Sequence, residues 1–417
     1  MAGTMASEAI AAHMRPPETS LDTSVETSRE APRDVAREAL SISRLRVTDF
    51  RSYDHAGLDL DTRPVVLTGE NGAGKTNLLE AVSLLVPGRG LRAVPFAELC
   101  RKRGAGGWAV AADVFDGQAD MRIGTGIEPQ EAGAGETRTR QVRIDGQVQS
   151  SAGVLAEYVR IVWLTPAMDR LFVEAASGRR RFLDRLVMGF DPSHGTRVNA
   201  YERAMRDRNR LLADNVKDAS WLGALEAQMA EHGVAIAATR LDCVARLKGA
   251  IAATQEGAFP KALLALEGGL ESDLSSAVAV DVEDQFARHL CEMRTRDQGA
   301  GRALDGPHRS DLLVRHEAKD MEADKCSTGE QKALLIGMIL ANARLLARHT
   351  GHAPLLLLDE VAAHLDRDRR AALFDEITAL GAQAWMTGTD RSLFEAIEPR
   401  AQCFQVEAGQ IRTVTNK

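Results

Sequence analysis

The residues with the clearest chemical potential form a glycine-rich loop between a predicted strand and a predicted helix. The pattern GxxxxGK[ST] is met by eight consecutive residues: Gly69, Glu70, Asn71, Gly72, Ala73, Gly74, Lys75 and Thr76. An apolar strand at 65–67 precedes this P-loop and an amphipathic helix follows it, which is the context that the motif requires. Glycines let backbone N–H groups surround phosphate oxygens, and the helix N-terminus adds the positive end of its dipole. We expect Lys75 to neutralise the β- and γ-phosphates and Thr76 to ligate Mg²⁺, so the loop predicts a nucleoside triphosphate site.

Two later motifs indicate the class of P-loop protein. One stands at the start of a predicted helix and consists of five residues: Ser327, Thr328, Gly329, Glu330 and Gln331. It looks like the signature motif of ABC-type ATPases, in which Ser and Gly approach the γ-phosphate of a nucleotide held by a second subunit. The other is an apolar run ending at Asp359 and Glu360, as expected of a strand buried on both faces. Asp359 would hold Mg²⁺ through water, Glu360 would polarise the attacking water, and Asp366 would lie in a D-loop. The order and spacing of the three motifs predict an ABC-type ATPase head.

Composition sets further limits. The chain has 417 residues, 44% of them hydrophobic, which is enough for a large core and for more than one domain. No apolar run approaches the ~18 residues of a membrane span, so no membrane association is expected. The five cysteines are scattered without CxxC spacing, which supports neither a disulfide framework nor a zinc site and favours a reducing cytoplasm.

The expected fold class is α/β: an ABC/SMC-type ATPase head with a flanking antiparallel sheet, plus a helical arm inserted between the two halves of the head. Residues 1–40 are rich in Ser, Thr, Glu, Ala and Pro and are predicted to be a disordered extension. The N-terminal half of the head would span 41–176, the helical arm 177–300, and the C-terminal half of the head 301–417.

Hydrophobic periodicity places the elements that must position these motifs. Alternating apolar residues predict strands over four segments: 45–50, 56–60, 108–114 and 119–127. A hairpin is expected to turn at Asp145-Gly146, which is a favoured two-residue turn. Apolar residues at three- and four-residue spacing over 220–254 predict a long helix, ~50 Å if continuous, which Gly233 and Gly249 could interrupt.

Five blocks of the sequence resemble the RecF family, ATPases of bacterial gap repair that are related to the SMC proteins. They lie at 45–53, at 77–81, at 163–184 with 201–212, at 306–309 and at 385–389. The resemblance covers about residues 42 to 412. Ser310 departs from it, because the family usually has a second acid there, and the role of that loop stays open. The strand that ends in a switch histidine in ABC transporters ends here in Thr387-Gly388-Thr389, so γ-phosphate sensing by a histidine is not expected.

The resemblance implies a specific function. A RecF-like protein would bind ATP and Mg²⁺, form a homodimer with ATP on double-stranded DNA near gap junctions, and hydrolyse ATP slowly with stimulation by DNA. It would work with RecR and RecO to load RecA, in the cytoplasm, in DNA replication, recombination, repair and the SOS response.

Basic residues are concentrated between Arg179 and Arg210, where nine arginines stand against four acids. Such a cluster could neutralise DNA phosphates, and the main candidates are Arg179, Arg180, Arg203, Arg206 and Arg210. Further candidates are Arg101-Lys102-Arg103, Arg138, Arg140 and Arg143, while Arg89 and Arg92 could reach either nucleotide or DNA. For any single arginine, a solvated helix face is the alternative. The aromatic content of 4% is too low for stacking on single-stranded bases, so contact with the duplex backbone is the better hypothesis.

Two other functions compete with this reading. The nucleotide-binding subunit of a membrane transporter is opposed by the missing switch histidine and by the helical insertion. A structural SMC protein needs a coiled-coil arm of hundreds of residues, whereas the arm predicted here spans 177–300 and contains no zinc-hook cysteines.

Overall fold

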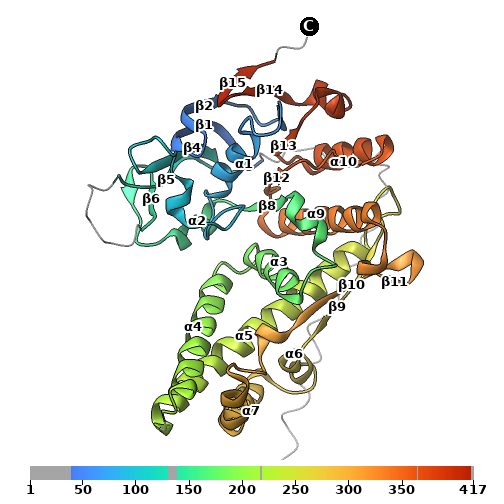
Figure 1. Ribbon diagram of the computed structural model, residues 1–417. Helices are drawn as coiled ribbons and strands as arrows, with labels where there is room; N and C mark the ends of the chain where they lie inside the picture. Colours follow the sequence, from blue (N-terminus) through green and yellow to red (C-terminus); the bar gives the residue numbers. More distant parts are fainter. Residues whose placement is uncertain (1–38, 130–138, 217, 364, 415–417) are drawn as a thin grey trace, which may run out of the picture. The chain divides into compact units, whose positions relative to one another are not determined.

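The computed structural model describes residues 39–129, 139–216, 218–363 and 365–414 (Figure 1). The predicted disordered extension, apart from its last two residues, lies outside this range, as does Arg138 of the hairpin. Leu40 is already fully buried, so the packed chain begins slightly earlier than expected. Among the described residues, no helix combines the length and apolar character needed to cross a membrane.

A six-stranded, mostly parallel sheet forms the centre of the head. Its strands, in order across the sheet, are β15 (Gln410–Thr413), β14 (Gln402–Glu407), β3 (Val65–Thr68), β13 (Ala384–Gly388), β12 (Leu355–Leu358) and β8 (Ile161–Leu164). Strand β15 is antiparallel to β14, and the other neighbours pair in parallel. Because β3 lies between β13 and β14, strands from opposite ends of the chain hydrogen-bond to each other. The two halves of the head therefore fold as one unit, as the motifs required.

Side chains on the two faces of this sheet belong to different hydrophobic cores. Val66, Leu356 and Met386 point into a core shared with the helices α9 (Thr328–Thr350) and α10 (Arg367–Leu380). Their neighbours in sequence, such as Leu67, Leu357 and Trp385, point into a core shared with the P-loop helix α1 (Lys75–Ser83) and the antiparallel sheet. This double burial explains why the strands read as continuous apolar runs.

The predicted antiparallel sheet is present beside the nucleotide core. Its strands, in spatial order, are β2 (Tyr53–Asp59), β1 (Ser41–Phe50), β4 (Trp108–Phe115), β5 (Asp120–Ile127), β6 (Gln141–Ile144) and β7 (Gln147–Val148). The hairpin between β6 and β7 turns at Asp145 and Gly146, whose φ angles are 49° and 83°. Positive φ at both positions is what a type I′ turn requires, and it explains the Asp-Gly pair.

A helical region lies between the two halves of the head in the sequence. Its helices are α3 (Ala176–Met188), α4 (His194–Ala213), α5 (Ala219–Ala252), α6 (Gly269–Leu274), α7 (Ala279–Glu292) and α8 (Arg294–Ala300). The long helix α5 runs without a break through Gly233 and Gly249, and α4 packs along it (Figure 1). Its N-cap Asp218 accepts hydrogen bonds from the backbone N–H groups of Ser220 and Trp221 at 2.9 and 3.0 Å. Such a cap satisfies N–H groups that have no partner inside the helix.

The segment 177–300, predicted to be a helical arm, also contains a strand. Strand β9 (Ala262–Glu267) pairs with β10 (Asp311–His316), and β10 pairs with β11 (Met321–Glu322), to form a three-stranded antiparallel sheet. This sheet crosses the boundary predicted between residues 300 and 301. Strand β9 was missed because Ala, Leu and Glu favour helices and its six residues include no β-branched side chain.

Short connections complete the chain. The helix α2 (Leu155–Tyr158) precedes β8. The 3₁₀ turns are η1 (Phe96–Leu99), η2 (Ala152–Val154), η3 (Pro166–Arg170), η4 (Pro307–Arg309), η5 (Glu317–Lys319), η6 (Ala323–Lys325), η7 (Arg391–Phe394) and η8 (Glu398–Arg400).

Candidate nucleotide-binding and nucleic-acid sites

The central sheet brings two of the three predicted nucleotide motifs to one edge. Strands β3, β13 and β12 are neighbours and run in parallel, so their carboxyl ends lie side by side. The P-loop follows β3, Thr387 and Gly388 end β13, and Asp359 and Glu360 follow β12. Such an edge is where open α/β sheets bind their ligands.

Glycine is required at two positions of the P-loop. At Gly69, φ is +148°, and an added Cβ would lie 2.1 Å from the backbone oxygen of Val406. Gly74 has φ +116° and is the N-cap of α1, where a Cβ would lie 2.6 Å from the hydroxyl oxygen of Tyr53. The Tyr53 hydroxyl donates to the carbonyl oxygen of Gly74 at 3.1 Å. Tyr53 thus supports the loop from β2, and it could have been suspected only from its place in the Arg51-Ser52-Tyr53 block.

Lys75 is held inside its own loop. Its Nζ donates to the carbonyl oxygens of Gly69 and Glu70 at 2.7 and 2.8 Å, and the residue is only 4% exposed. Burial lowers the pKa of Lys75, while the nearby carboxylates of Glu360 and Asp359 raise it. The ammonium group is therefore placed where an anion would compete with two neutral carbonyls for its protons, and charge-assisted hydrogen bonds are the stronger ones.

Hydroxyl groups link the P-loop to the acids after β12. The Thr76 hydroxyl donates to Asp359 Oδ1 at 2.9 Å, and the Thr387 hydroxyl donates to the same oxygen at 2.7 Å. The backbone N–H of Glu360 in turn donates to the Thr387 hydroxyl at 2.8 Å. Glu360 has φ +51°, an uncommon conformation for a residue with a side chain. Thr387 was noted in the sequence but given no function.

The Thr76 hydroxyl and the Asp359 carboxylate supply oxygen atoms, the ligand type that Mg²⁺ prefers. Their 2.9 Å hydrogen bond shows that both side chains reach one point. Among the described residues, no group of three or more His, Cys, Asp or Glu side chains could hold a metal ion by itself. The residues present thus suit an ion that keeps water and phosphate oxygens in its coordination sphere.

The signature residues form the exposed start of α9. Ser327 is the N-cap and forms a capping box with Glu330: its backbone N–H donates to Glu330 Oε2 at 3.0 Å, and its hydroxyl accepts from the Glu330 N–H at 3.4 Å. An ion pair with Lys319 and hydrogen bonds from Ser327 lower the pKa of Glu330 to about 2. Gln331 is buried and donates to the carbonyl oxygen of Cys326 at 2.8 Å. Ser327 and Thr328 remain exposed, and an added Cβ on Gly329 would meet nothing within 4 Å, so another molecule can approach this turn.

Asp366 has a structural role at the start of α10. Its Oδ1 accepts from the backbone N–H of Arg369 at 2.8 Å, and its side chain remains 58% exposed. The predicted D-loop residue is therefore a helix N-cap that a second molecule could still reach.

The structure separates the arginine candidates. Arg179 donates two hydrogen bonds of 2.7 Å to the carboxylate of Asp311 and further bonds to the backbone carbonyls of residues 171, 172 and 174. It is thus occupied in joining α3 to β10, and the structure does not support it as a phosphate contact. Arg180 donates to the carbonyl oxygen of Ser310 at 2.8 Å and is half-buried. Arg208, part of the same basic cluster, is fully buried and cannot reach DNA.

Three of the candidates are exposed along one side of α4. Arg203, Arg206 and Arg210 lie three and four residues apart, which places them on a common face. Arg206 lies 3.8 Å from Glu202 and Arg210 lies 3.2 Å from Asp207, with both guanidinium side chains about two-thirds exposed. Exposed pairs of this kind are weak, so these arginines can exchange their partners for phosphates.

Several secondary candidates are engaged in the fold. Arg140 donates to the carbonyl oxygens of Leu84 and Gly88 in the segment after α1, and burial lowers its pKa to about 10. Arg101 pairs with Asp49 at 2.8 Å. Arg92 forms an ion pair with the buried carboxylate of Glu80, with its Nη1 2.9 Å from Glu80 Oε2. The remaining secondary candidates that are exposed in the described part of the chain are Arg89, Lys102, Arg103 and Arg143.

The structure shows what surrounds Ser310, where the family usually has an acid. The Ser310 hydroxyl donates to Glu271 Oε1 at 2.6 Å, and both side chains are buried. A carboxylate thus does lie at this point, but α6 supplies it. His308, in η4 just before Ser310, lies with its Nδ1 2.8 Å from the hydroxyl of Tyr201 on α4. Burial lowers the pKa of His308, which keeps the ring neutral near pH 7.

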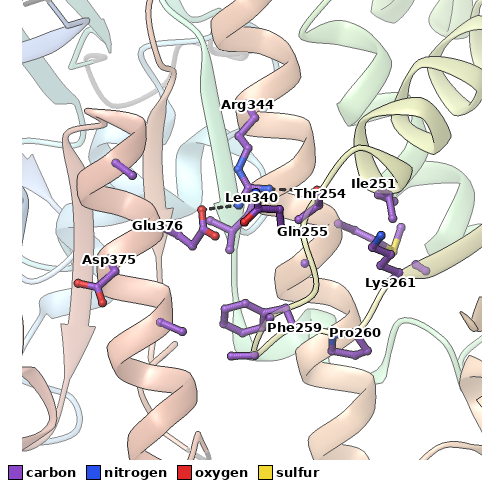
Figure 2. A pocket seen from close by; sticks show the side chains of 17 residues that line it. Ile251, Thr254, Gln255, Phe259, Pro260, Lys261, Leu340, Arg344, Asp375 and Glu376 are labelled. Carbon is purple, nitrogen blue, oxygen red and sulfur yellow. Dashed lines mark hydrogen bonds and ion pairs between the residues drawn. The ribbon is translucent and has the colours of Figure 1, made fainter. Parts of the chain in front are cut away.

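A separate cavity of about 370 Å³ lies where the end of α5 and the loop to β9 meet α9 and α10 (Figure 2). Arg344 forms an ion pair there with Glu376 and donates to the Thr254 hydroxyl at 3.4 Å. No P-loop or signature residue lines this cavity, so it is distinct from the candidate nucleotide site.

Comparisons with known proteins agree with this geometry. The family model described as RecF/RecN/SMC N terminal domain matches residues 41–412. The curated relative named DNA replication and repair protein RecF from Rhizobium leguminosarum bv. trifolii (strain WSM2304) is 54% identical over 373 residues, which cover 89% of this chain and 98% of the relative. The protein of the same name from Rhizobium meliloti (strain 1021) is 50% identical over 371 residues, with the same two coverages.

Solved structures match the fold. The recombination mediator protein RecF-ATPrS in the RecFOR pathway superposes with a TM-score of 0.79 at 22% identity, covering 91% of this chain and 99% of that one. An Smc head domain derived from Pyrococcus furiosus, with an extended coiled coil and bound to the C-terminal domain of ScpA, gives a TM-score of 0.51 at 16% identity, covering 91% and 96%. At these identities the matches show the fold alone, and they confirm the predicted α/β head of the ABC/SMC type.

Proposed function

The chain belongs to the RecF family of DNA replication and repair proteins, and from that premise we propose that it binds ATP with Mg²⁺ and closes into a homodimer on duplex DNA beside single-stranded gaps. The observation that carries the nucleotide part of the proposal is the hydrogen bond between Thr76 and Asp359, residues 283 positions apart in the sequence. It brings the P-loop and the acidic strand end to one point, as nucleotide hydrolysis requires.

Each residue of the site has a chemical task in this proposal. Lys75 exchanges its two carbonyl partners for β- and γ-phosphate oxygens, and the P-loop N–H groups bind the remaining phosphate oxygens. Thr76 and Asp359 would hold Mg²⁺, Asp359 through water, and the ion would neutralise phosphate charge. Glu360 accepts a proton from the attacking water, so it acts as the general base of a slow, DNA-stimulated hydrolysis.

The second subunit completes the site. Ser327 and Gly329 of one copy would cover the γ-phosphate bound by Lys75 of the other, and Asp366 would lie at the same interface. Support comes from the exposure of the α9 start and from the helix N-terminus there, which favours anions. Because each nucleotide is enclosed only by two copies, ATP binding and dimerisation are coupled.

DNA contact is assigned to the phosphate backbone. The exposed face of Arg203, Arg206 and Arg210 on α4 supports it, with Arg180 as a further contact near α3. No base readout is expected, so unrelated duplex sequences should bind equally. In this proposal the dimer marks duplex next to a gap in the cytoplasm and helps RecR and RecO to load RecA there.

The test is duplex binding at low salt with ATP, with ADP and without nucleotide. We expect binding with ATP, weak binding in the other two conditions, and equal affinity for duplexes of unrelated sequence. Absence of duplex binding with ATP would remove the DNA part of the proposal, while a measured ATP affinity in the same samples would preserve the nucleotide part.

A further inference from the structure

Thr387 is a buried hydroxyl at the centre of the candidate nucleotide site, and no function has been assigned to it above. It lies near the end of β13, between β3 with the P-loop and β12 with the acids, and it is fully buried. Its two hydrogen bonds, to Asp359 Oδ1 at 2.7 Å and from the Glu360 N–H at 2.8 Å, go to two consecutive residues.

The chemistry of the partners fixes the direction of both hydrogen bonds. An ionised carboxylate can only accept, so the single Thr387 proton points to Asp359. A backbone N–H can only donate, so a Thr387 lone pair accepts from Glu360. The Thr76 proton likewise points to Asp359 Oδ1, which directs the lone pairs of Thr76 away from that carboxylate. Both hydroxyls use Oδ1, and neither uses the second oxygen, Oδ2.

The neighbouring position cannot supply the same function. At Gly388, an added Cβ would lie 2.5 Å from Cε2 and 2.9 Å from Cζ of the Phe394 ring. Phe394 is itself fully buried, so the ring has little room to move. A polar side chain at residue 388 is therefore excluded, and the hydroxyl one residue earlier is the polar group that this strand presents to both acids.

We propose that Thr387 is a positioning residue for ATP hydrolysis, which rests on the function proposed above. Its hydroxyl orients the carboxylate of Asp359 toward the metal and holds the backbone of Glu360 in its positive-φ conformation, so that the metal ligand and the general base keep a fixed relation. The group acts through these two residues and does not touch the nucleotide.

The test compares Thr387→Val with Thr387→Ser. Valine has nearly the same shape but lacks the hydroxyl, whereas serine keeps it. We expect Thr387→Val to keep its ATP affinity, to lose about 10- to 100-fold in single-turnover hydrolysis, and to need more Mg²⁺ for half-maximal rate, as is typical when a partner of a metal ligand is lost. Thr387→Ser should hydrolyse ATP close to the wild-type rate. Thr378→Val is the matched control, since the exposed Thr378 hydroxyl donates only to the Phe374 carbonyl of its own helix, at 2.8 Å.

Loss of packing alone would not shift the Mg²⁺ requirement or be restored by serine. Wild-type turnover and Mg²⁺ dependence in Thr387→Val would overturn the positioning role, and so would equal losses in the valine and serine variants. If the wild-type protein bound ATP and the Thr387 variants gave one of these results, only the positioning role would be wrong. A wild-type protein that neither bound nor hydrolysed ATP would overturn the proposed function as well.

Discussion

Single residues in the site are engaged with one another through hydrogen bonds. Lys75 contacts two carbonyls, and Asp359 accepts hydrogen bonds from Thr76 and Thr387. Binding therefore exchanges existing hydrogen bonds for new ones, with little need to order free side chains. Pre-organisation of this kind lowers the entropic cost of binding.

Glu360→Gln is the residue-scale test of the hydrolysis mechanism. An amide cannot take a proton from water at neutral pH, so turnover should fall by about 100-fold or more, within the range typical of a lost general base. ATP affinity should stay within about threefold, because uniform binding contacts are unchanged. The dimer of this variant should remain on DNA, and measuring the molecular mass of the complex over time would show this. Glu256→Gln, on an exposed turn after α5, is the control.

The role of a residue can be predicted from sequence when its interaction partners lie in the same motif, but not when they lie far away in the chain. The P-loop, Ser327 and Asp359 lie where their motifs predict, after a strand, at the start of a helix and after a buried strand, because each motif fixes its local context. Arg179 was taken as a DNA contact because its partner Asp311 lies 132 residues away and no local pattern pairs them.

Helices and strands could be predicted where the spacing of apolar residues stayed regular along the whole element. Helix α5 was expected over 220–254 and spans Ala219–Ala252, because its apolar spacing continues through both glycines. Strand β9 was not expected, because residues 262–266 are all apolar and do not alternate with polar residues, and because their propensities favour helix. What fixes β9 as a strand is its pairing with β10, a long-range contact that no local window contains.

A buried ion network joins the helices α4, α5 and α8. Arg208 contacts Glu226 at 3.0 Å, Asp297 at 2.7 Å and the carbonyl oxygen of Leu290 at 2.6 Å, and all three charged side chains are at most 2% exposed. Arg294 forms a second ion pair with Glu226. Each carboxylate is thus buried only because an arginine accompanies it.

Arg208→Ala should therefore destabilise the helical region severely. The change leaves the carboxylate of Asp297 buried without its cation, and loss of one partner from a buried pair costs about 3–5 kcal/mol. Urea denaturation would measure the loss of free energy of unfolding. Arg203→Ala, at an exposed position of the same helix, should change it by less than about 0.5 kcal/mol. Equal urea midpoints for the two variants would contradict the structural role of the network.

At the scale of the whole molecule, a net charge of −7 coexists with a row of exposed arginines on α4. The acidic remainder would repel DNA from other surfaces, so that a few arginines decide how the duplex docks. In the proposed dimer, two such rows would meet one duplex, and DNA affinity would therefore depend on ATP.

Reversing two charges on the exposed arginine face of α4 tests whether duplex DNA binds there. Arg206→Glu with Arg210→Glu should weaken binding equally for unrelated duplexes and reduce the slope of log affinity against log salt by about 2, since each neutralised phosphate contributes roughly 0.9. The same double reversal at Arg246 and Lys248, exposed on α5, changes the net charge equally and should leave the slope unchanged. Unaltered affinity in the α4 variant would move the site to Lys102, Arg103 and the hairpin.

The central claim is that ATP joins two copies of this chain through the signature turn and that duplex DNA strengthens the pair. Mass measurement of the purified protein in solution tests it most directly, with and without ATP and with and without a short duplex, alongside Ser327→Arg. We expect a monomer without nucleotide, a dimer with ATP, a more persistent dimer with ATP and duplex, and a Ser327→Arg protein that binds ATP but stays monomeric, because its bulky cation would occupy the γ-phosphate contact. A wild-type protein that remained monomeric with ATP and duplex, or a Ser327→Arg protein that dimerised normally, would contradict the account.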